Sequence, residues 1–285
     1  MHYDVLITGG KGFIARSLTP MFRLEGYDVY SPTHQELDVS NKYQVDEFFK
    51  KNTVDIVIHT AVKGGNRTDS ESYENLQTNL LMFENLLNNK ESYRLLFTFG
   101  SGAEFDRRFP ILRVCEENIF KKHPIDAYGL AKNIICRRIY EETYNVINLR
   151  LFGCFGPLEE NFRLIKNNVQ RAINGEYMVI HQDKFMDYFF INDVYKVIQY
   201  IMTTVSNVVD YNYKSLNLSY MSKYRLSDIA TSIAFIVGKP NLKIHIETGG
   251  WGMPYTGNGS MLSTLNLPLT GLENGILEMY ESMMI

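Results

Sequence analysis

Runs of β-branched and apolar residues alternate along the first half of the chain with segments whose apolar residues recur at helical spacing. The first run, at 3–8, precedes a glycine-rich turn and a helical segment at 13–25 that ends at a glycine. The later segments, in order, predict a strand at 28–30, a helix at 45–49, a strand at 55–59, a helix at 75–87, a strand at 94–99, a helix at 127–140 and a strand from 146. This alternation with short connections predicts an α/β fold with a doubly wound parallel sheet.

The pattern becomes less regular after Pro157. It predicts a helix at 162–173, a strand at 177–180 and a strand followed by a helix within 186–202. The glycine-rich segment 248–260 is predicted to be a loop. We therefore expect two parts in one compact body, a larger one formed by 1–160 with 189–218 and a smaller C-terminal one formed by 161–188 with 219–285.

Composition narrows the class of partner. The 285 residues are 45% hydrophobic and 21% charged, and the formal net charge of -3 argues against a protein that depends on nucleic-acid phosphates or on an anionic membrane. Neither a secretory signal nor an apolar run of roughly 18 residues is evident. The three cysteines, at 115, 136 and 154, form no C-x-x-C pair, so no metal site is indicated. We expect a cytoplasmic protein that binds small molecules.

A glycine-rich turn joins the first predicted strand to the first helix. Gly9 permits a tight turn, and Gly12 lets the backbone approach a pyrophosphate without a Cβ in the way. Ala15 is small enough for the helix to pack on the sheet. The helix N-terminus offers free N–H groups to an anion. In this context the turn predicts a Rossmann-type dinucleotide site rather than a simple chain reversal.

The second strand bears on the choice of cofactor. Folds that bind NAD usually place an acid about 20 residues past the glycine loop, on the ribose hydroxyls. No carboxylate lies between Tyr30 and Gln35, and Lys11 stands within the loop. A 2′-phosphate would meet at least one cation and little repulsion, so the sequence favours NADP(H) over NAD(H).

Tyr128 and Lys132 stand four residues apart on a predicted helix and therefore project from one face. An ammonium beside a phenol is expected to lower the tyrosine pKa, which suits a general acid that protonates a carbonyl oxygen. Ser101, just after the strand at 94–99, is placed to hydrogen-bond the same oxygen. The three residues together predict carbonyl chemistry.

At this point the sequence resembles the extended short-chain dehydrogenase/reductase family over most of its length. The motifs that carry the resemblance are TGGKGFIA at 8–15, FGSGAEF at 99–105, YGLAK at 128–132, LFGCFGP at 151–157 and FFINDV at 189–194. The resemblance implies that Ser101, Tyr128 and Lys132 are catalytic and that Lys132 also holds the nicotinamide ribose. The further cofactor-binding residues that it implies are Gly9, Lys11, Gly12, Phe13, Ile14, Asp38, Val39 and Ala61.

Two further expectations come from the same resemblance. Asn79 is similar to the helix residue that often supports the active site in this family, and the helices at 75–87 and 127–140 would form a homodimer face. The larger part of the chain would bind the dinucleotide, and the smaller part would bind a nucleotide sugar.

The loop after Ser101 separates the reaction types within the family. Dehydratases of the family have the pattern T-D-E or T-S-E there. This chain has Gly102 and Ala103 in the last two places of that pattern, and Glu104 falls one position later, on the opposite side of an extended segment. Dehydration is therefore not expected. The chain most resembles the GDP-L-fucose synthase group, in ELDVSNKYQVDEFF, IHTAVKGG and TNLLMFENLL. That group epimerises with a Cys and a His, and this chain has Ala103 and Asn168 in their places, so the resemblance implies reduction without epimerisation.

The substrate end is less clearly marked. The family's diphosphate-binding Arg falls at Met186, and Lys184 is a substitute. Candidate substrate contacts are Gly102, Phe162, Arg163, Lys166, Lys184, Arg225 and Trp251. For the cations and aromatic residues among them, a solvated surface position is an equal alternative.

The sequence thus predicts an NADPH-dependent reductase of the C4 keto group of a nucleotide-linked hexose or heptose. GDP is the first choice of nucleotide, and the resemblance implies sugars for capsule or lipopolysaccharide. One alternative is an NAD-dependent nucleotide-sugar 4-epimerase, which would use the same Ser101, Tyr128 and Lys132. The other is a Rossmann protein that binds cofactor without catalysis.

Overall fold

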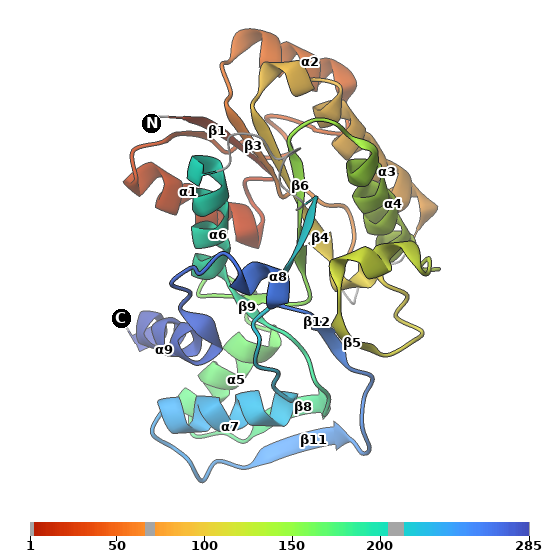
Figure 1. The fold of residues 1–285 in the computed structure, drawn as a ribbon. Helices are drawn as coiled ribbons and strands as arrows, with labels where there is room; N and C mark the ends of the chain where they lie inside the picture. The colour runs from red at the N-terminus through yellow and green to blue at the C-terminus, as the bar shows by residue number, and fades with distance from the viewer. Residues whose placement is uncertain (1–2, 66–71, 205–213, 285) are drawn as a thin grey trace. The chain divides into compact units, whose positions relative to one another are not determined.

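The structure is a computed structural model that describes residues 3–65, 72–204 and 214–284 (Figure 1). The strands are β1 Asp4–Thr8, β2 Asp28–Tyr30, β3 Ile56–His59, β4 Leu95–Ser101, β5 Ile111–Val114, β6 Val146–Leu151, β7 Cys154–Phe155, β8 Met178–Gln182, β9 Phe189–Phe190, β10 Ser215–Leu218, β11 Ile244–Thr248 and β12 Tyr255–Gly257. The helices are α1 Phe13–Leu24, α2 Lys42–Lys51, α3 Tyr73–Leu87, α4 Ala127–Glu141, α5 Leu164–Ile173, α6 Ile191–Thr204, α7 Leu226–Ile236, α8 Ser260–Ser263 and α9 Gly271–Met284. Three 3-10 turns are η1 Lys90–Ser92, η2 Gly102–Glu104 and η3 Glu116–Phe120.

The main sheet has six strands in the order β10-β6-β4-β3-β1-β2. The pairs β1–β2, β1–β3 and β3–β4 are parallel, which confirms the predicted α/β fold with a doubly wound sheet. The chain runs from β1 outward to β2 and then crosses to β3 on the other side of β1. The strand order therefore reverses between β1 and β3, and ligands of such sheets bind outside the carboxyl ends of the strands at this point.

A hydrophobic core joins α2, α3 and α4 to one face of the sheet. Val45, Phe83 and Ile135 come from the three helices and pack with Leu6 and Leu96 of the strands. α3 and α4 lie side by side over this face (Figure 1). Burying a Leu or Phe side chain contributes about 1.5–3 kcal/mol each, so the core explains why the apolar residues at helical spacing predicted these helices correctly.

The chain divides into two compact units by its internal contacts. The first comprises 1–107, 116–150 and 197–216, and the second comprises 108–115, 151–196 and 217–285. This grouping places 108–115, 151–160, 189–196 and 217–218 in the second unit, whereas the sequence pattern placed them in the larger part. The assignment of dinucleotide to one part and nucleotide sugar to the other stays a prediction.

The second unit contains three short parallel pairs, β8–β11, β5–β12 and β7–β9, with α5, α7 and α9 packed together. Asp193, which is fully buried, accepts the backbone N–H groups of Thr270 and Gly271 at 2.7 and 2.9 Å and so caps the start of α9. The prediction of a loop over 248–260 was wrong in part, because β12 lies within it and pairs with β5, a strand that the pattern did not indicate.

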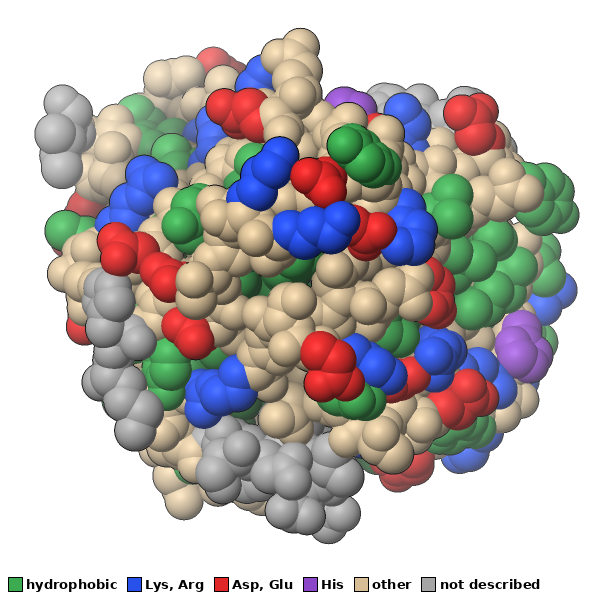
Figure 2. Space-filling model, turned by 90° about the horizontal axis from the view of Figure 1, so that it is seen from above, with side chains coloured by type: hydrophobic (Ala, Val, Ile, Leu, Met, Phe, Trp, Pro, Cys, Tyr) green, Lys and Arg blue, Asp and Glu red, His purple; other side chains and the backbone are tan. Residues whose placement is uncertain are grey.

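Charged side chains of both signs are interspersed on the face shown in Figure 2, as the near-neutral net charge leads one to expect. Over 3–65, 72–204 and 214–284, no helix combines the length and apolar character needed to cross a bilayer. In the same ranges no three His, Cys, Asp or Glu side chains gather in a way that could hold a metal ion.

Candidate active site

The phosphate loop lies at the point where the strand order reverses. Gly9 has φ +71°, and a Cβ there would stand 2.9 Å from the Cα of Ala61, which follows β3. The N–H of Gly12 donates to the carbonyl of Gly9 at 2.8 Å, and Gly12 is the N-cap of α1. The loop is therefore closed too tightly for side chains at Gly9, and it presents the N-terminus of α1. The residues present fit a dinucleotide pyrophosphate.

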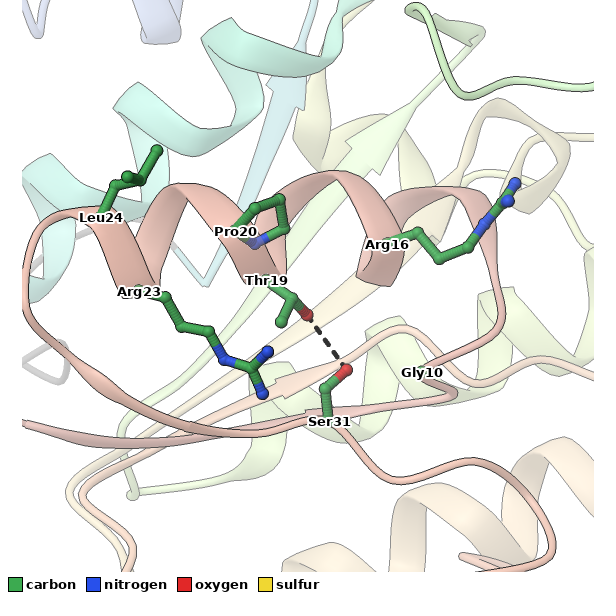
Figure 3. A pocket seen from close by; sticks show the side chains of 7 residues that line it. All are labelled: Gly10, Arg16, Thr19, Pro20, Arg23, Leu24 and Ser31. Atoms are coloured by element: carbon green, nitrogen blue, oxygen red, sulfur yellow. Dashed lines mark hydrogen bonds between the residues drawn. The ribbon is translucent and has the colours of Figure 1, made fainter.

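Close by, α1 and the end of β2 line a pocket of ≈ 570 Å³ (Figure 3). Arg16 and Arg23 project from α1 beside it, and Thr19 donates a hydrogen bond to the Ser31 hydroxyl at 3.0 Å. Gly10 also lines the pocket, and a Cβ there would stand 2.3 Å from the Ser31 carbonyl oxygen. The pocket therefore borders the phosphate loop and carries two cations.

Glu36 is a carboxylate that directly follows the stretch from Tyr30 to Gln35, on which the preference for NADP(H) was based. Its Oε2 accepts the backbone N–H of Thr33 at 2.7 Å. This hydrogen bond lowers the Glu36 pKa, and the charge of Lys11 lowers it further. Lys11 and Glu36 thus bring charges of both signs to this region. Among the other predicted cofactor residues, Asp38 accepts two hydrogen bonds from Ser40 and is turned toward its own loop.

Ser101, Tyr128 and Lys132 lie together at the end of β4 and the start of α4. The hydroxyls of Ser101 and Tyr128 are hydrogen-bonded. The Lys132 Nζ donates to the carbonyl oxygen of Phe99 at 2.7 Å. Lys132 is buried and Tyr128 is partly buried. The structure therefore brings the three predicted catalytic residues into one site.

The start of α4 is fixed by local contacts. Asp126 is its N-cap and accepts the N–H of Gly129 at 2.7 Å, while Arg107 pairs with the same carboxylate at 2.7 Å. A Cβ on Gly129 would stand 2.5 Å from the carbonyl oxygen of Ala103. The glycine in YGLAK thus lets the helix touch the turn after Ser101.

One electrostatic expectation was wrong. The Tyr128 pKa is raised from its ordinary value, because burial disfavours the phenolate. The hydrogen bond to Ser101 and the charge of Arg107 oppose this rise. Lys132 is not among the groups that shift the Tyr128 pKa, so the expected lowering by Lys132 is not seen.

The protonation of Lys132 predicts a pH dependence. Burial lowers the Lys132 pKa to about 8, although the charge of Glu104 opposes this shift. If the ammonium is the active form, activity is retained below this pKa and lost above it. We expect an alkaline limb with a midpoint near this value in the profile of kcat/KM, which reports groups of the free enzyme. A profile that stays flat from about pH 7 to 9.5 would contradict the role of Lys132.

The loop after β3 supports Tyr128 from the other side. Asn79 on α3 accepts the N–H of Lys63 at 3.0 Å and donates to its carbonyl at 2.9 Å. Two residues later, Gly65 has φ +96°, and a Cβ there would stand 2.8 Å from Cε2 of the Tyr128 ring. The sequence analysis singled out Asn79 but not Gly65, which the K-G-G pattern marks only as a turn.

The predicted substrate residues of the second unit are only partly gathered. The Arg225 guanidinium stands 5.7 Å from the Trp251 ring, but it also binds Asp228 at 2.8 and 3.1 Å, so its charge is already paired. The side chain of Lys184 lies against Gly252, which follows Trp251, and stands 3.3 Å from where a Cβ on Gly252 would be. Phe162 is 72% exposed. A substrate role for these residues stays a prediction.

Two more of the predicted substrate contacts, Lys166 and Arg163, have structural partners, as has Asn168. The Lys166 Nζ donates to the carbonyls of Pro157 and Glu159, both at 2.8 Å. Asn168, which is buried, joins α5 to β8 by donating to the carbonyl of Val179 and accepting its N–H, at 2.9 and 2.7 Å. The side chain at the expected epimerase position thus links two elements of the fold. Arg163 stands 4.0 Å from Glu159.

Comparison with known proteins decides the family. The model of the NAD dependent epimerase/dehydratase family matches residues 5–216. The chain belongs to the NAD dependent epimerase/dehydratase family. This confirms the resemblance to extended short-chain dehydrogenases/reductases.

The similarity to individual known proteins is confined to a short stretch or is low in sequence identity. The chain is similar to a GDP-L-fucose synthase from Azorhizobium caulinodans, with 36% identity over 62 residues, which are 21% of this chain and 20% of that protein. A GDP-mannoheptose C4 reductase from Campylobacter jejuni, solved with NADP bound, has a TM-score of 0.85 at 19% identity, with 100% of this chain and 99% of the other covered. A UDP-glucose 4-epimerase from Thermotoga maritima has a TM-score of 0.80 at 17% identity, with coverage of 100% and 99%. The two structures show the shared fold.

Proposed function

We propose that the protein reduces the C4 keto group of a nucleotide-activated hexose or heptose with NADPH, for the synthesis of surface polysaccharide sugars. The observation that carries the proposal is the hydrogen-bonded pair of Ser101 and Tyr128 beside the buried Lys132. Such a pair can bind one oxygen and deliver a proton to it. Its place at the carboxyl end of β4, in the same sheet as the phosphate loop, suits a reaction with a dinucleotide.

The residues of the chain have distinct parts in this reaction. Gly9, Gly12 and the N-terminus of α1 would hold the pyrophosphate, and the bound nicotinamide would supply a hydride. The Ser101 hydroxyl orients the carbonyl oxygen of the sugar. The Tyr128 hydroxyl gives its proton to that oxygen as the alkoxide forms, and the raised Tyr128 pKa means that the proton is present at neutral pH.

Separate observations bear on dehydration, epimerisation and cofactor binding without catalysis as alternatives to reduction. Glu104, the acid nearest to a dehydratase position, is fully buried and ion-paired with Arg150. The solved C4 reductase named above was crystallised with NADP, which supports NADPH and a GDP-linked substrate here. A 4-epimerase is the second candidate, because the Thermotoga enzyme shares the fold. The grouping of Ser101, Tyr128 and Lys132 argues against a protein that binds cofactor without catalysis, because such a protein would not need these three side chains together.

The direct test is NADPH oxidation with enzymatically generated GDP-4-keto sugars, one a 6-deoxyhexose and one a heptose. We expect oxidation of NADPH, slower oxidation of NADH, and a product with a new C4 hydroxyl by NMR. UDP-glucose and UDP-galactose serve in parallel, since their interconversion without net oxidation would establish the epimerase. Tight binding of NADPH with no reaction in any arm would favour a non-catalytic protein.

The preference for NADPH is expected to depend on Lys11, which is exposed in the phosphate loop. Loss of one charge-assisted contact with a 2′-phosphate costs about 1.5 kcal/mol, or roughly tenfold in Kd. Lys11→Ala should therefore raise the Kd for NADPH by that factor and leave the Kd for NADH unchanged, as measured by fluorescence titration. Lys51→Ala, at another exposed lysine, is the control. Equal weakening of both dinucleotides would show that Lys11 does not read the 2′-phosphate.

We also propose that the protein forms a homodimer through α3 and α4. Leu81 on α3 and Ile134 on α4 are 53% and 38% exposed, so both helices keep apolar surface outside the core. A monomer in sedimentation velocity at micromolar concentration would remove this proposal.

A further inference from the structure

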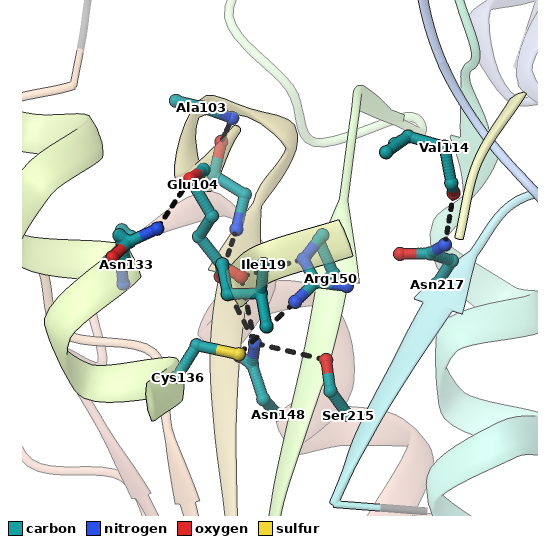
Figure 4. A network of polar contacts seen from close by, with 12 residues as sticks. Ala103, Glu104, Val114, Ile119, Asn133, Cys136, Asn148, Arg150, Ser215 and Asn217 are labelled. Carbon is teal, nitrogen blue, oxygen red and sulfur yellow. Dashed lines mark hydrogen bonds and ion pairs between the residues drawn. The ribbon is translucent and has the colours of Figure 1, made fainter. Parts of the chain in front are cut away.

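Beneath the end of β4 lies an ion pair that the proposed chemistry does not use. The Arg150 Nε donates to the Glu104 Oε2 at 2.7 Å, and neither side chain has any exposed surface (Figure 4). Burying two charges costs several kcal/mol per ion, and their attraction often does no more than offset it. Stability alone is thus a weak reason for this pair. The contacts of Glu104 instead indicate a role at Ser101.

The Glu104 carboxylate faces the backbone of Ser101. Its Oε1 accepts the Ser101 N–H at 3.0 Å, and the Ser101 hydroxyl in turn accepts the N–H of Ala103 at 3.2 Å. The two bonds close a capping box around η2. A Cβ on Gly100 would stand only 2.1 Å from Oε1, so the strand backbone lies directly on the carboxylate. The position of Ser101 therefore depends on where Glu104 is held.

Glu104 itself is held by the neighbouring elements. Asn148 on β6 donates to Oε1 and Oε2 at 3.1 and 3.2 Å, beside the contact from Arg150 (Figure 4). Asn133 on α4 donates to the Glu104 carbonyl at 2.9 Å, and it directly follows the catalytic Lys132. The Glu104 carboxylate thus ties β6 to the turn that begins with Ser101, and the Glu104 backbone carbonyl ties the Lys132-bearing helix to it.

We propose that Glu104 is a positioning residue for Ser101, which fixes the direction of the Ser101 hydroxyl toward the substrate carbonyl. The inference rests on the proposed function, since it assigns Ser101 the carbonyl oxygen. Glu104 acts through its acceptor for the Ser101 N–H, and the Arg150 charge makes the buried carboxylate tolerable.

The test separates the acceptor from the charge with two neutral pairs. Glu104→Gln with Arg150→Met keeps an oxygen for the Ser101 N–H, whereas Glu104→Leu with Arg150→Met removes it. We expect the Leu pair to lower kcat about 100-fold, the cost of misplacing a catalytic group by roughly 1 Å. The KM and the Kd for NADPH should change less than threefold, and the Gln pair should stay within tenfold of wild-type kcat. Equal kcat for the two pairs would overturn the proposal.

A cycle with Ser101→Ala distinguishes positioning from a general structural role. If Glu104 acts through Ser101, adding the Leu pair to Ser101→Ala should lower kcat no further. A further 100-fold loss would show an effect independent of Ser101 and contradict the proposal.

Hydrogen exchange of the Ser101 amide gives a measurement that needs no substrate and no Leu pair. Exchange in the Gln pair should remain as slow as in the wild type, whereas Glu104→Ala with Arg150→Met should speed it. An unchanged rate in both would refute the contact. If the wild type turns over no 4-keto sugar while these exchange rates follow the prediction, the proposed function fails and the positioning of Ser101 stands.

Discussion

Tyr128→Phe is expected to lower kcat for reduction by about 10²- to 10⁴-fold, the usual contribution of a positioned general acid. The change removes one oxygen and keeps the ring, so the contact with Gly65 is preserved. Since the phosphate loop is formed by other residues, the Kd for NADPH should not change. We expect NADPH oxidation to be slowed by this factor, while titration gives the same Kd for NADPH as in the wild type.

Tyr140→Phe provides the matched control for this experiment. Tyr140 lies on the same helix and packs its ring on Phe120, with centroids 5.0 Å apart. Loss of its hydroxyl should leave kcat near the wild-type value. If Tyr128→Phe kept the wild-type rate, or if both variants lost activity equally, Tyr128 would not be the proton donor.

Gly65→Ala is expected to lower kcat by about 10- to 100-fold through a shift of the Tyr128 ring. The added Cβ would stand 2.8 Å from Cε2 and 3.2 Å from Cζ, so either the ring or the loop must move. A displacement of about 1 Å at a catalytic group can cost roughly 100-fold in rate. Steady-state kinetics should show the loss mainly in kcat.

Gly26→Ala separates the contact with the ring from the backbone cost. Gly26 has φ +86°, close to the φ of +96° at Gly65, but no atom lies within 4 Å of its absent Cβ. Both variants pay a left-handed backbone penalty of about 1–2 kcal/mol in stability. Only Gly65→Ala should lower kcat. Equal losses of activity in the two variants would mean that Gly65 does not position Tyr128.

The sequence predicted the parts of the molecule whose signals are local. Strands such as β3 are short apolar runs, and α3 and α4 bury one apolar stripe, so pattern alone predicted β1, β2, β3, β4 and β6 of the main sheet but not β10. The phosphate loop was predicted because turn glycines stand between a strand and a helix. The spacing of Tyr128 and Lys132 likewise placed both on one helix, which the structure shows beside Ser101.

Contacts between distant segments could not be read in this way. β5 is paired with β12, and the residue pattern of neither segment indicates that the other is its partner. From the sequence, Glu104 served only to argue against a dehydratase. Its contacts with Ser101, Asn148 and Arg150 depend on the packing of β4 against β6. The rise in the Tyr128 pKa depends on burial, which residue spacing does not reveal.

The pairing of β5 with β12 has a consequence for the order in which the protein can fold during synthesis. β5 leaves the ribosome soon after β4, but its partner is not made until Tyr255–Gly257, near the end of the chain. β5 must therefore remain an unpaired strand while residues 115–254 are translated. Contacts of such sequence separation form slowly, so completion of the second unit is expected to be a late step of folding that follows the synthesis of β12.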